Sequence, residues 1–393
     1  MEEENTASAT YSHDFKDSYL TFEALEDEAF TLTVPANVDS TYMTSVSYST
    51  DNGKTWNTTT INNTAQTITT PTINAGDKVL WKGVGKQLSV FSSGINYSFN
   101  FSSTGNFNAS GNIMSLLYGD DFSEQTIFSS DSSYNFYYIF NDNTKILSAK
   151  NLNLPAIILT NSCYYGMFNN CSSLTTAPEL PATTLSDSCY CYMFNGCTSL
   201  TTAPELPATI LAKNCYSYMF NGCTALTTAP ELSATTLTKG CYMRMFNNCT
   251  SLIDAPELLA TNPQGGSTIG DISYCEMFCG CTSLVNAPSI LPATTLTRSC
   301  YINMFKGCTS LEKAPELPAT TLVNNCYENM FNGCTSLNHI KALFTTTPSN
   351  TYTRNWVKDV AANGTFVKNT SATWTTTGTN AVPTGWTVQT ASS

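Results

Sequence analysis

Apolar positions recur along the chain with a long period between residues 161 and 340. The pattern Met-Phe-x-x-Cys occurs seven times there, and successive copies are most often 26 residues apart. A coil of this length cannot bury its own apolar face, but stacked coils can, because each covers the next. The period therefore predicts a stack of seven coils, which begin their patterns at Met167, Met193, Met219, Met245, Met277, Met304 and Met330.

Each unit has the same residue type at the same position, which predicts columns of like side chains along the stack. A phenylalanine column starts at Phe168 and a leucine column starts at Leu174, and we expect both to form the core. The segment Leu-Thr-Thr-Ala-Pro-Glu-Leu is short and β-compatible, so we interpret it as the strand of each coil. Its proline lacks an N–H, so we expect the strand pairing to be brief or interrupted there.

All 16 cysteines lie between Cys163 and Cys334. Seven follow Met-Phe and six precede the next Met by four, and we interpret these two columns as buried thiols, because free cysteine behaves as a small apolar residue. Disulfides between coils and a metal site are alternatives. Side chains in register point the same way, which suits a disulfide poorly, and the Cys-x7-Cys spacing is not that of a zinc site. The question of a bridge or ion stays open at Cys275, Cys279 and Cys281.

Residues 18–120 alternate apolar and polar side chains in short runs, which predicts a β-domain that resembles a sandwich. The predicted strands include Phe30–Val34 and a pair, Thr44–Thr50 and Trp56–Ile61, joined by the hairpin signal Asp51-Asn-Gly53. Further strands are expected at 78–82 and 97–101. The same hairpin matches an Asp-box, a motif of sialidases and other propellers, but one copy indicates only a hairpin.

The two ends of the stack should be sealed by atypical units. Residues 121–160 contain a degenerate unit in which Asn143 stands where later units place cysteine, so we expect an N-terminal cap. Residues 341–393 form the expected C-terminal cap. Within it, Tyr352–Ala362 is predicted to form an amphipathic helix with Trp356, Val357 and Val360 inward, followed by short strands in 365–388.

The segment Phe-Asn-Gly-Cys-Thr-Ser-Leu-Thr at Phe194–Thr201 resembles the BspA-type leucine-rich repeat, and the resemblance covers roughly residues 135–345. It implies a leucine-rich-repeat solenoid of ~26-residue coils. The family occurs on surface proteins of Bacteroidetes and in proteins of their phages, and it is associated with adhesion and protein binding. The flanks, at 19–27 and 382–388, resemble segments that accompany such repeats. This chain departs from the family in its Ala-Pro-Glu-Leu-Pro-Ala segment and its additional cysteine column.

Charged residues make up only 12% of the chain, and the net charge is -12. The acidity is concentrated near the N-terminus, where residues 1–17 are interpreted as an acidic, solvated tail. The scarcity of Lys and Arg argues against nucleic acid as a partner. Only two histidines occur, and no phosphate-binding loop, His-Glu zinc motif or serine elbow is found. No secretory signal and no membrane span are predicted.

Two columns are candidates for ligand binding. A glutamate column, interrupted at Ser289, could be a solvated row, a binding face for a basic or hydroxyl-rich ligand, or a weak calcium ladder, because stacked carboxylates repel unless they are solvated or bridged. A tyrosine column could serve an interface or stack on sugars, or it could pack between coils. The candidates are Glu179, Glu205, Glu231, Glu257, Glu316, Tyr164, Tyr190, Tyr216, Tyr242, Tyr301 and Tyr327.

These features together predict a mainly β, non-enzymatic binding protein without catalytic residues, metal or cofactor. We expect it on a virion surface, or outside or on the surface of a cell, where it recognises a host-cell or bacterial surface protein or glycan. A phage fibre component is slightly favoured over a bacterial adhesin, since no signal peptide is visible in this chain. The alternative is a carbohydrate-active enzyme or a carbohydrate-binding module. The oligomeric state is left open.

Overall fold

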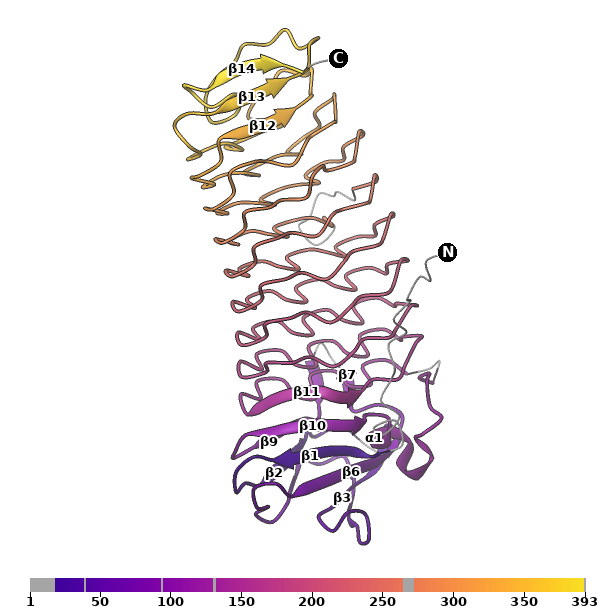
Figure 1. The fold of residues 1–393 in the computed structure, drawn as a ribbon. Helices are drawn as coiled ribbons and strands as arrows, with labels where there is room; N and C mark the ends of the chain where they lie inside the picture. The colour runs from indigo at the N-terminus through magenta and orange to yellow at the C-terminus, as the bar shows by residue number, and fades with distance from the viewer. Residues whose placement is uncertain (1–17, 39, 93–94, 130–131, 264–271, 392–393) are drawn as a thin grey trace, which may run out of the picture.

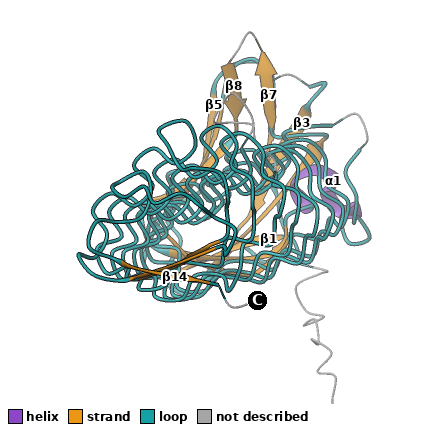
Figure 2. Ribbon diagram, turned by 90° about the horizontal axis from the view of Figure 1, so that it is seen from above, coloured by secondary structure: helices purple, strands orange, loops and turns teal. Residues whose placement is uncertain are grey.

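The computed structural model describes residues 18–38, 40–92, 95–129, 132–263 and 272–391. The fold is mainly β, as predicted, and helix is confined in these residues to α1 (Ser115–Tyr118) and the 3-10 turn η1 (Gly119–Asp121). Sheets occupy the N-terminal end, a stack of coils rises from them, and a small sheet closes the other end (Figure 1). Seen along the stack, the coils superimpose (Figure 2).

Two sheets and a hairpin make up the N-terminal end. The larger sheet has the order β11 (Ile146–Asn153), β10 (Phe107–Asn112), β1 (Leu20–Ala24), β6 (Lys78–Gly85), β3 (Met43–Ser49) and β4 (Asn57–Thr60). The smaller, antiparallel sheet has the order β5 (Gln66–Thr69), β2 (Phe30–Val34) and β9 (Asn100–Ser103). The strands β7 (Ser89–Ser92) and β8 (Ile95–Ser98) form the hairpin, which projects to one side of the coils (Figure 2). The run predicted as one strand at 97–101 is divided between β8 and β9.

Aromatic side chains join the two sheets. Phe22 of β1 lies 5.3 Å from Phe30 of β2 and 4.9 Å from Phe101 of β9, measured between ring centroids. Trp81 of β6 lies 5.0 Å from the same Phe101. All four rings are buried, so the alternation in β1 and β2 places one face of each sheet in a shared aromatic core.

The predicted hairpin is confirmed by the antiparallel pairing of β3 with β4. Its turn is fixed by Asp51, which accepts hydrogen bonds from the N–H and Oγ1 of Thr55 at 2.9 and 2.7 Å and from Ser49 Oγ at 2.8 Å. These donors favour the ionised carboxylate and lower the pKa of Asp51 to about 2. The Asp-box residues therefore serve the turn.

Glu28 is a buried carboxylate in the core of the N-terminal end. Its Oε2 accepts the N–H of Gly105 at 3.2 Å, and its Oε1 has no hydrogen-bond partner among the described residues. Burial, reinforced by the nearby Glu26, raises the pKa of Glu28 to about 7 against the lowering effects of backbone N–H groups and Lys145. Such a group destabilises the fold when it ionises.

The coils begin at the edge of the larger sheet. Strand β11 pairs in parallel with β10, and Ser148 of β11 continues the parallel pairing to Thr176 of the first coil. From there the pairing passes through single bridges, Thr176 to Thr202 and Thr202 to Thr228. In the coils from Thr176 to Asp254, the expected strand is thus reduced to one bridged residue, and the following Ala-Pro-Glu segment forms no bridge, in agreement with the expected interruption at proline. The later coils add further bridges, from Ile290 to Glu316 and from Leu317 to Ala342.

Most of the hydrogen bonding between coils lies in a turn segment that the sequence did not reveal. In residues 188–196, every second N–H donates to a carbonyl of the next coil, as from Tyr190 to Cys215 at 3.1 Å. The N–H groups between them close tight turns onto carbonyls three residues earlier. The geometry requires left-handed residues four apart, at Ser188, Tyr192 and Gly196, with φ of 56, 58 and 71°.

The phenylalanine and leucine columns are buried, as predicted. From Phe140 to Phe331 the rings stack face to face with centroids 5.3 to 5.8 Å apart. The cysteine that follows each Met-Phe donates its S–H to the phenylalanine carbonyl of the preceding coil, as from Cys197 to Phe168 at 3.1 Å. All 16 cysteines are free and 15 are buried, which confirms the thiol interpretation.

The same contacts connect the stack to the N-terminal sheets. Phe140 stacks on Phe101 of β9 with centroids 5.7 Å apart. Asn143 stands at the cysteine position, as predicted, and its Nδ2 donates to the Phe101 carbonyl at 3.0 Å, where later coils use a thiol. The core therefore runs from the sheets into the coils without a break at residue 120.

At the C-terminal end, the predicted helix at Tyr352–Ala362 is wrong. The segment repeats the tight turns of the coils and receives their hydrogen bonds, as from the N–H of Phe331 to the Trp356 carbonyl at 2.8 Å. Trp356 is fully buried against Tyr327, Phe331 and Phe344, so one large ring covers the ends of two columns. The parallel strands β12 (His339–Ala342), β13 (Thr365–Lys368) and β14 (Thr387–Thr390) complete this end.

Replacing Phe220 by alanine should lower the free energy of unfolding by about 3–5 kcal/mol, because it removes a buried ring from the middle of the column and leaves a cavity. Urea unfolding measures this change. Thr209→Ala, on the exposed surface of a neighbouring coil, should change the stability by less than about 0.5 kcal/mol. A loss below about 1 kcal/mol in Phe220→Ala would contradict the column as the source of stability.

The stability of the wild type should fall as the pH rises from 4.5 to 8. Glu28 binds its proton more tightly when folded, so its contribution is complete below its ordinary pKa of 4.5 and is lost as the pH passes about 7. Glu28→Gln removes this titrating group. We therefore expect the free energy of unfolding of the variant, relative to that of the wild type, to rise by roughly 2–4 kcal/mol over this pH range. Chemical unfolding at several pH values measures it, and a constant difference would refute the assignment.

Candidate functional site

The tyrosine column is buried between the coils, so its members cannot contact a ligand. Tyr164, Tyr190, Tyr216, Tyr242, Tyr301 and Tyr327 are each at most 2% exposed. Their rings stack with centroids 5.7 to 6.2 Å apart, and Tyr274, which sequence reasoning missed, fills the place in the coil with the insertion. The ligand-binding hypothesis for these tyrosines is therefore wrong, and packing between coils accounts for the column.

The hydroxyl groups of this column are unusual for buried tyrosine. Those of Tyr164, Tyr190, Tyr216 and Tyr301 are buried and have no hydrogen-bond partner among the described residues. Burial raises the pKa of Tyr190 well above its ordinary value, so the hydroxyl is neutral. Leaving such a donor unpaired costs about 1–3 kcal/mol, so the gain from stacking must exceed this cost.

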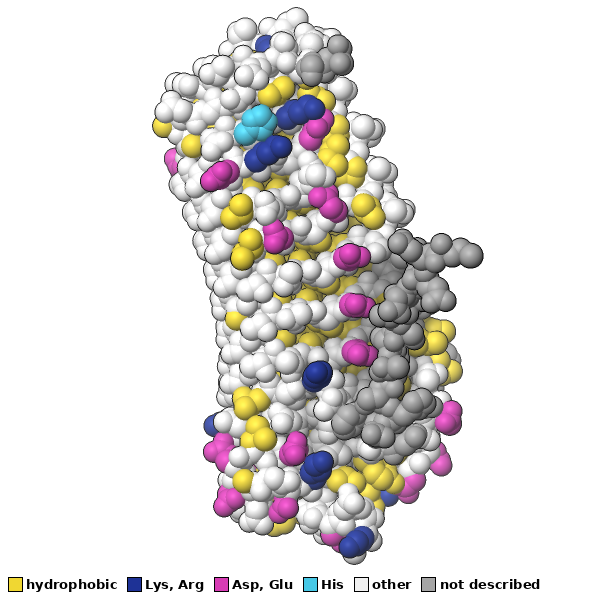
Figure 3. Space-filling view, in the orientation of Figure 1, with side chains coloured by type: hydrophobic (Ala, Val, Ile, Leu, Met, Phe, Trp, Pro, Cys, Tyr) yellow, Lys and Arg dark blue, Asp and Glu magenta, His cyan; other side chains and the backbone are white. Residues whose placement is uncertain are grey.

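The glutamate column is on the surface. Glu179, Glu205, Glu231 and Glu257 are exposed, and Glu316 is half-buried. Acidic side chains follow one another along the face of the stack, with apolar side chains beside them (Figure 3). The column has one member per coil because the backbone register that stacks the phenylalanines inside also aligns these positions outside. We call this set, with its flanking prolines and alanines, the Glu row.

The Glu row changes its partners towards the C-terminal end. Glu257 accepts hydrogen bonds from the N–H and Oγ of Ser289, where the next coil lacks glutamate. Glu316 forms an ion pair with Lys341, with 3.0 Å between Nζ and Oε2. No cationic partner of Glu179, Glu205, Glu231 or Glu257 is found among the described residues. The first three coils thus present the carboxylates most open to a ligand.

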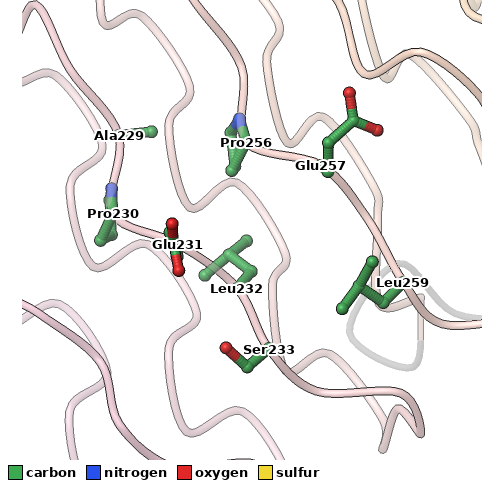
Figure 4. Close-up of a pocket in the computed structure, with 8 residues that line it drawn as sticks. All are labelled: Ala229, Pro230, Glu231, Leu232, Ser233, Pro256, Glu257 and Leu259. Carbon is green, nitrogen blue, oxygen red and sulfur yellow. The ribbon is translucent and has the colours of Figure 1, made fainter. Parts of the chain in front are cut away.

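A shallow groove of about 240 Å³ lies on the Glu row between two successive coils. The Pro-Glu segments of these coils run side by side, and Leu232 lies in the space between them (Figure 4). The groove offers an apolar floor and the Glu231 carboxylate, which suits the aliphatic stem and the charge of a basic side chain. The Glu257 carboxylate points away from it towards Ser289 of the next coil (Figure 4). The groove is lined by Ala229, Pro230, Glu231, Leu232, Ser233, Pro256, Glu257 and Leu259.

A second surface, which sequence reasoning missed, consists of tyrosines immediately before Met-Phe. Tyr192 and Tyr218 are half-buried and stack with centroids 4.4 Å apart. Arg244 extends the series: its guanidinium lies over the Tyr218 ring, donates to Tyr218 Oη at 2.7 Å and pairs with Glu276 at 2.9 Å. Only two of the seven units carry tyrosine at this position, so the sequence shows no periodic pattern that would predict this surface.

The cysteines left open by the sequence are thiols. Cys275 and Cys281 are buried, Cys279 is partly buried, and all three are free. Burial raises the pKa of Cys275 to about 12 and also raises that of Cys279, so both are protonated at neutral pH. Within the described residues, no group of three or more His, Cys, Asp or Glu side chains is arranged to hold a metal ion.

Searches against protein-family models, curated proteins and solved structures each returned no match. Among the described residues, no helix has the length and apolar character needed to cross a membrane.

Tyr216→Phe should leave the free energy of unfolding unchanged or raise it, because the substitution keeps the stacked ring and removes an unpaired hydroxyl. Tyr218→Phe is the matched control two residues away, and it should cost about 1 kcal/mol because Arg244 loses its acceptor. Urea unfolding of both variants tests the distinction. A larger loss in Tyr216→Phe than in Tyr218→Phe would show that the buried hydroxyl has a partner.

Proposed function

We propose that this chain is a non-enzymatic, surface-displayed binding protein that recognises a protein or glycan through the Glu row. The observation that carries the proposal is a set of exposed carboxylates, repeated at one place in successive coils, beside an apolar groove. A stack with a continuous stacked core holds these groups at fixed spacing, so little conformational freedom remains to be lost when a ligand binds.

We class the coils as a BspA-type leucine-rich-repeat solenoid and the N-terminal sheets as a β-sandwich. The repeated Phe-Asn-Gly-Cys-Thr-Ser-Leu-Thr segment and the parallel bridges between coils support the first assignment. The aromatic layer between the two N-terminal sheets supports the second. The family's association with adhesion favours an adhesin or a receptor-binding fibre component.

The charge of the row defines the ligand class. Glu179, Glu205, Glu231 and Glu257 favour a partner that brings lysine or arginine side chains, or hydroxyl groups that donate to carboxylates. A basic ligand would also relieve the repulsion between carboxylates on neighbouring coils. We favour a phage or prophage fibre protein over a bacterial adhesin; neighbouring genes that encode virion proteins would support this choice.

The test is an array of peptides and glycans probed with the full chain and with a triple variant. Glu179→Gln, Glu205→Gln and Glu231→Gln together should weaken binding to the recognised ligand at least about tenfold, and added salt should weaken wild-type binding in the same direction. The matched control makes the same change in net charge at three other exposed acids, through Asp121→Asn, Glu312→Gln and Asp359→Asn.

Equal binding by the wild type and both variants would exclude the Glu row as the binding site. Equal weakening in both variants would show that the ligand responds to the net charge of the protein and not to the Glu row in particular. A carbohydrate-active enzyme is the competing class, because a pair of carboxylates can hydrolyse glycosides. Hydrolysis of a glycan panel by the wild type, abolished by a single glutamate substitution, would overturn the binding proposal.

A further inference from the structure

A second depression, of about 490 Å³, lies where the N-terminal sheets meet the first turns of the stack. Its volume is within the range of small-molecule sites, about 300–1,000 Å³. It includes no residue of the Glu row. Residues from β8, β9 and the degenerate coil line it: Ser98, Asn100, Tyr138, Asn141 and Asp142.

Tyr138 is the one aromatic residue among those that line the depression. Its ring is perpendicular to the stacked pair Tyr137 and Tyr165, with interplanar angles of 72 and 88°. The ring therefore lies across Gly166 of the next coil, where a Cβ would overlap its Cε1 and Cδ1 atoms. Tyr192 and Tyr218 cover each other's faces, whereas Tyr138 rests on a glycine and lines an open depression.

The polar groups around this ring are held in place before any ligand binds. Asn100 Nδ2 donates to the carbonyls of Tyr138 and Asn141 at 3.1 and 2.9 Å. These two hydrogen bonds fix the orientation of the amide, so its Oδ1 points away from both carbonyls. Asp142 accepts from Asn141 Nδ2 and from Asn170 Nδ2 at 2.6 and 2.8 Å, so its carboxylate has a set orientation and retains unused lone pairs.

Ser98 also lines this depression, but its Oγ is buried beneath the surface and is out of reach of a ligand there. Asp142 is the only charged residue that lines the depression, so an anionic ligand would be repelled.

We propose that this depression binds a neutral sugar ring. The C–H face of the sugar packs on the Tyr138 ring, and its hydroxyls donate to the Asp142 carboxylate and to Asn100 Oδ1. The inference is independent of the Glu row, since none of these residues belongs to it. The same protein thus has one elongated acidic face and one compact site of lectin-like chemistry.

Saturation-transfer NMR on the full chain tests the proposal with glucose, galactose, mannose, fucose and N-acetylglucosamine as neutral probes and N-acetylneuraminic acid as the anionic comparison. At least one neutral sugar should receive saturation, and the anionic sugar should not bind more tightly. Tyr138→Asn and Asp142→Gly should each weaken the bound sugar at least about tenfold.

Both substitutions suit their left-handed backbone. Asparagine occupies the position of Tyr138 in later coils, at Asn303 and Asn329, and glycine occupies the position of Asp142 at Gly196 and Gly222. The matched controls make the same changes at the same coil positions outside the depression, Tyr192→Asn and Asn248→Gly, and should bind within about twofold of the wild type.

Saturation of none of the five neutral sugars would overturn the proposal, and so would tighter binding of N-acetylneuraminic acid. Wild-type affinity in Tyr138→Asn and Asp142→Gly, with unchanged melting curves, would place the sugar elsewhere. If circular dichroism shows that Tyr138→Asn is unfolded, Asp142→Gly decides, because Asp142 is exposed and other coils carry glycine at its position. Loss of sugar binding in the Glu-row variant, with Asp142→Gly unaffected, would assign the sugar to the Glu row instead.

Discussion

The structure depends on the register between successive coils. Phenylalanine rings in neighbouring coils lie 5.3 to 5.8 Å apart and nearly parallel, and the tyrosine rings beside them lie 5.7 to 6.2 Å apart. At this spacing a ring has only the rings above and below as partners for its two faces. A shift of one residue in any coil would leave unfilled volume in both columns, so packing fixes the register of every coil.

The same register determines the outer surface. An exposed position that is aligned with a buried column is repeated at the coil spacing whether or not repetition serves a ligand, so the Glu row follows from the stack itself. What the stack adds is rigidity: every second N–H in the turn segment reaches the next coil, and the carboxylates are carried on that framework. A solvated row of glutamates and a binding face would therefore have the same geometry. They differ only in whether a ligand or water contacts the carboxylates.

Periodicity predicted the core columns well but could not tell inside from outside for tyrosine. A side chain with an apolar ring and a polar tip fits either place, and only the structure shows Tyr190 and Tyr216 stacked in the core. Tyr192 and Tyr218 lack a period and were missed. The predicted helix at 352–362 failed because inward residues at Trp356, Val357 and Val360 fit both a helix and the tight turns of a coil.

Departures from the repeat are where individual chemistry can arise. A side chain in a regular column is constrained by identical neighbours on both sides, so no single coil can acquire a unique site without breaking the pattern. The degenerate coil departs from the pattern at Asn143, which replaces a thiol and connects the stack to Phe101. The next coil departs from it at Gly166, where the absence of a side chain leaves room for the Tyr138 ring. An atypical unit is required to seal the stack, and its irregular surface also forms the compact depression at Asp142.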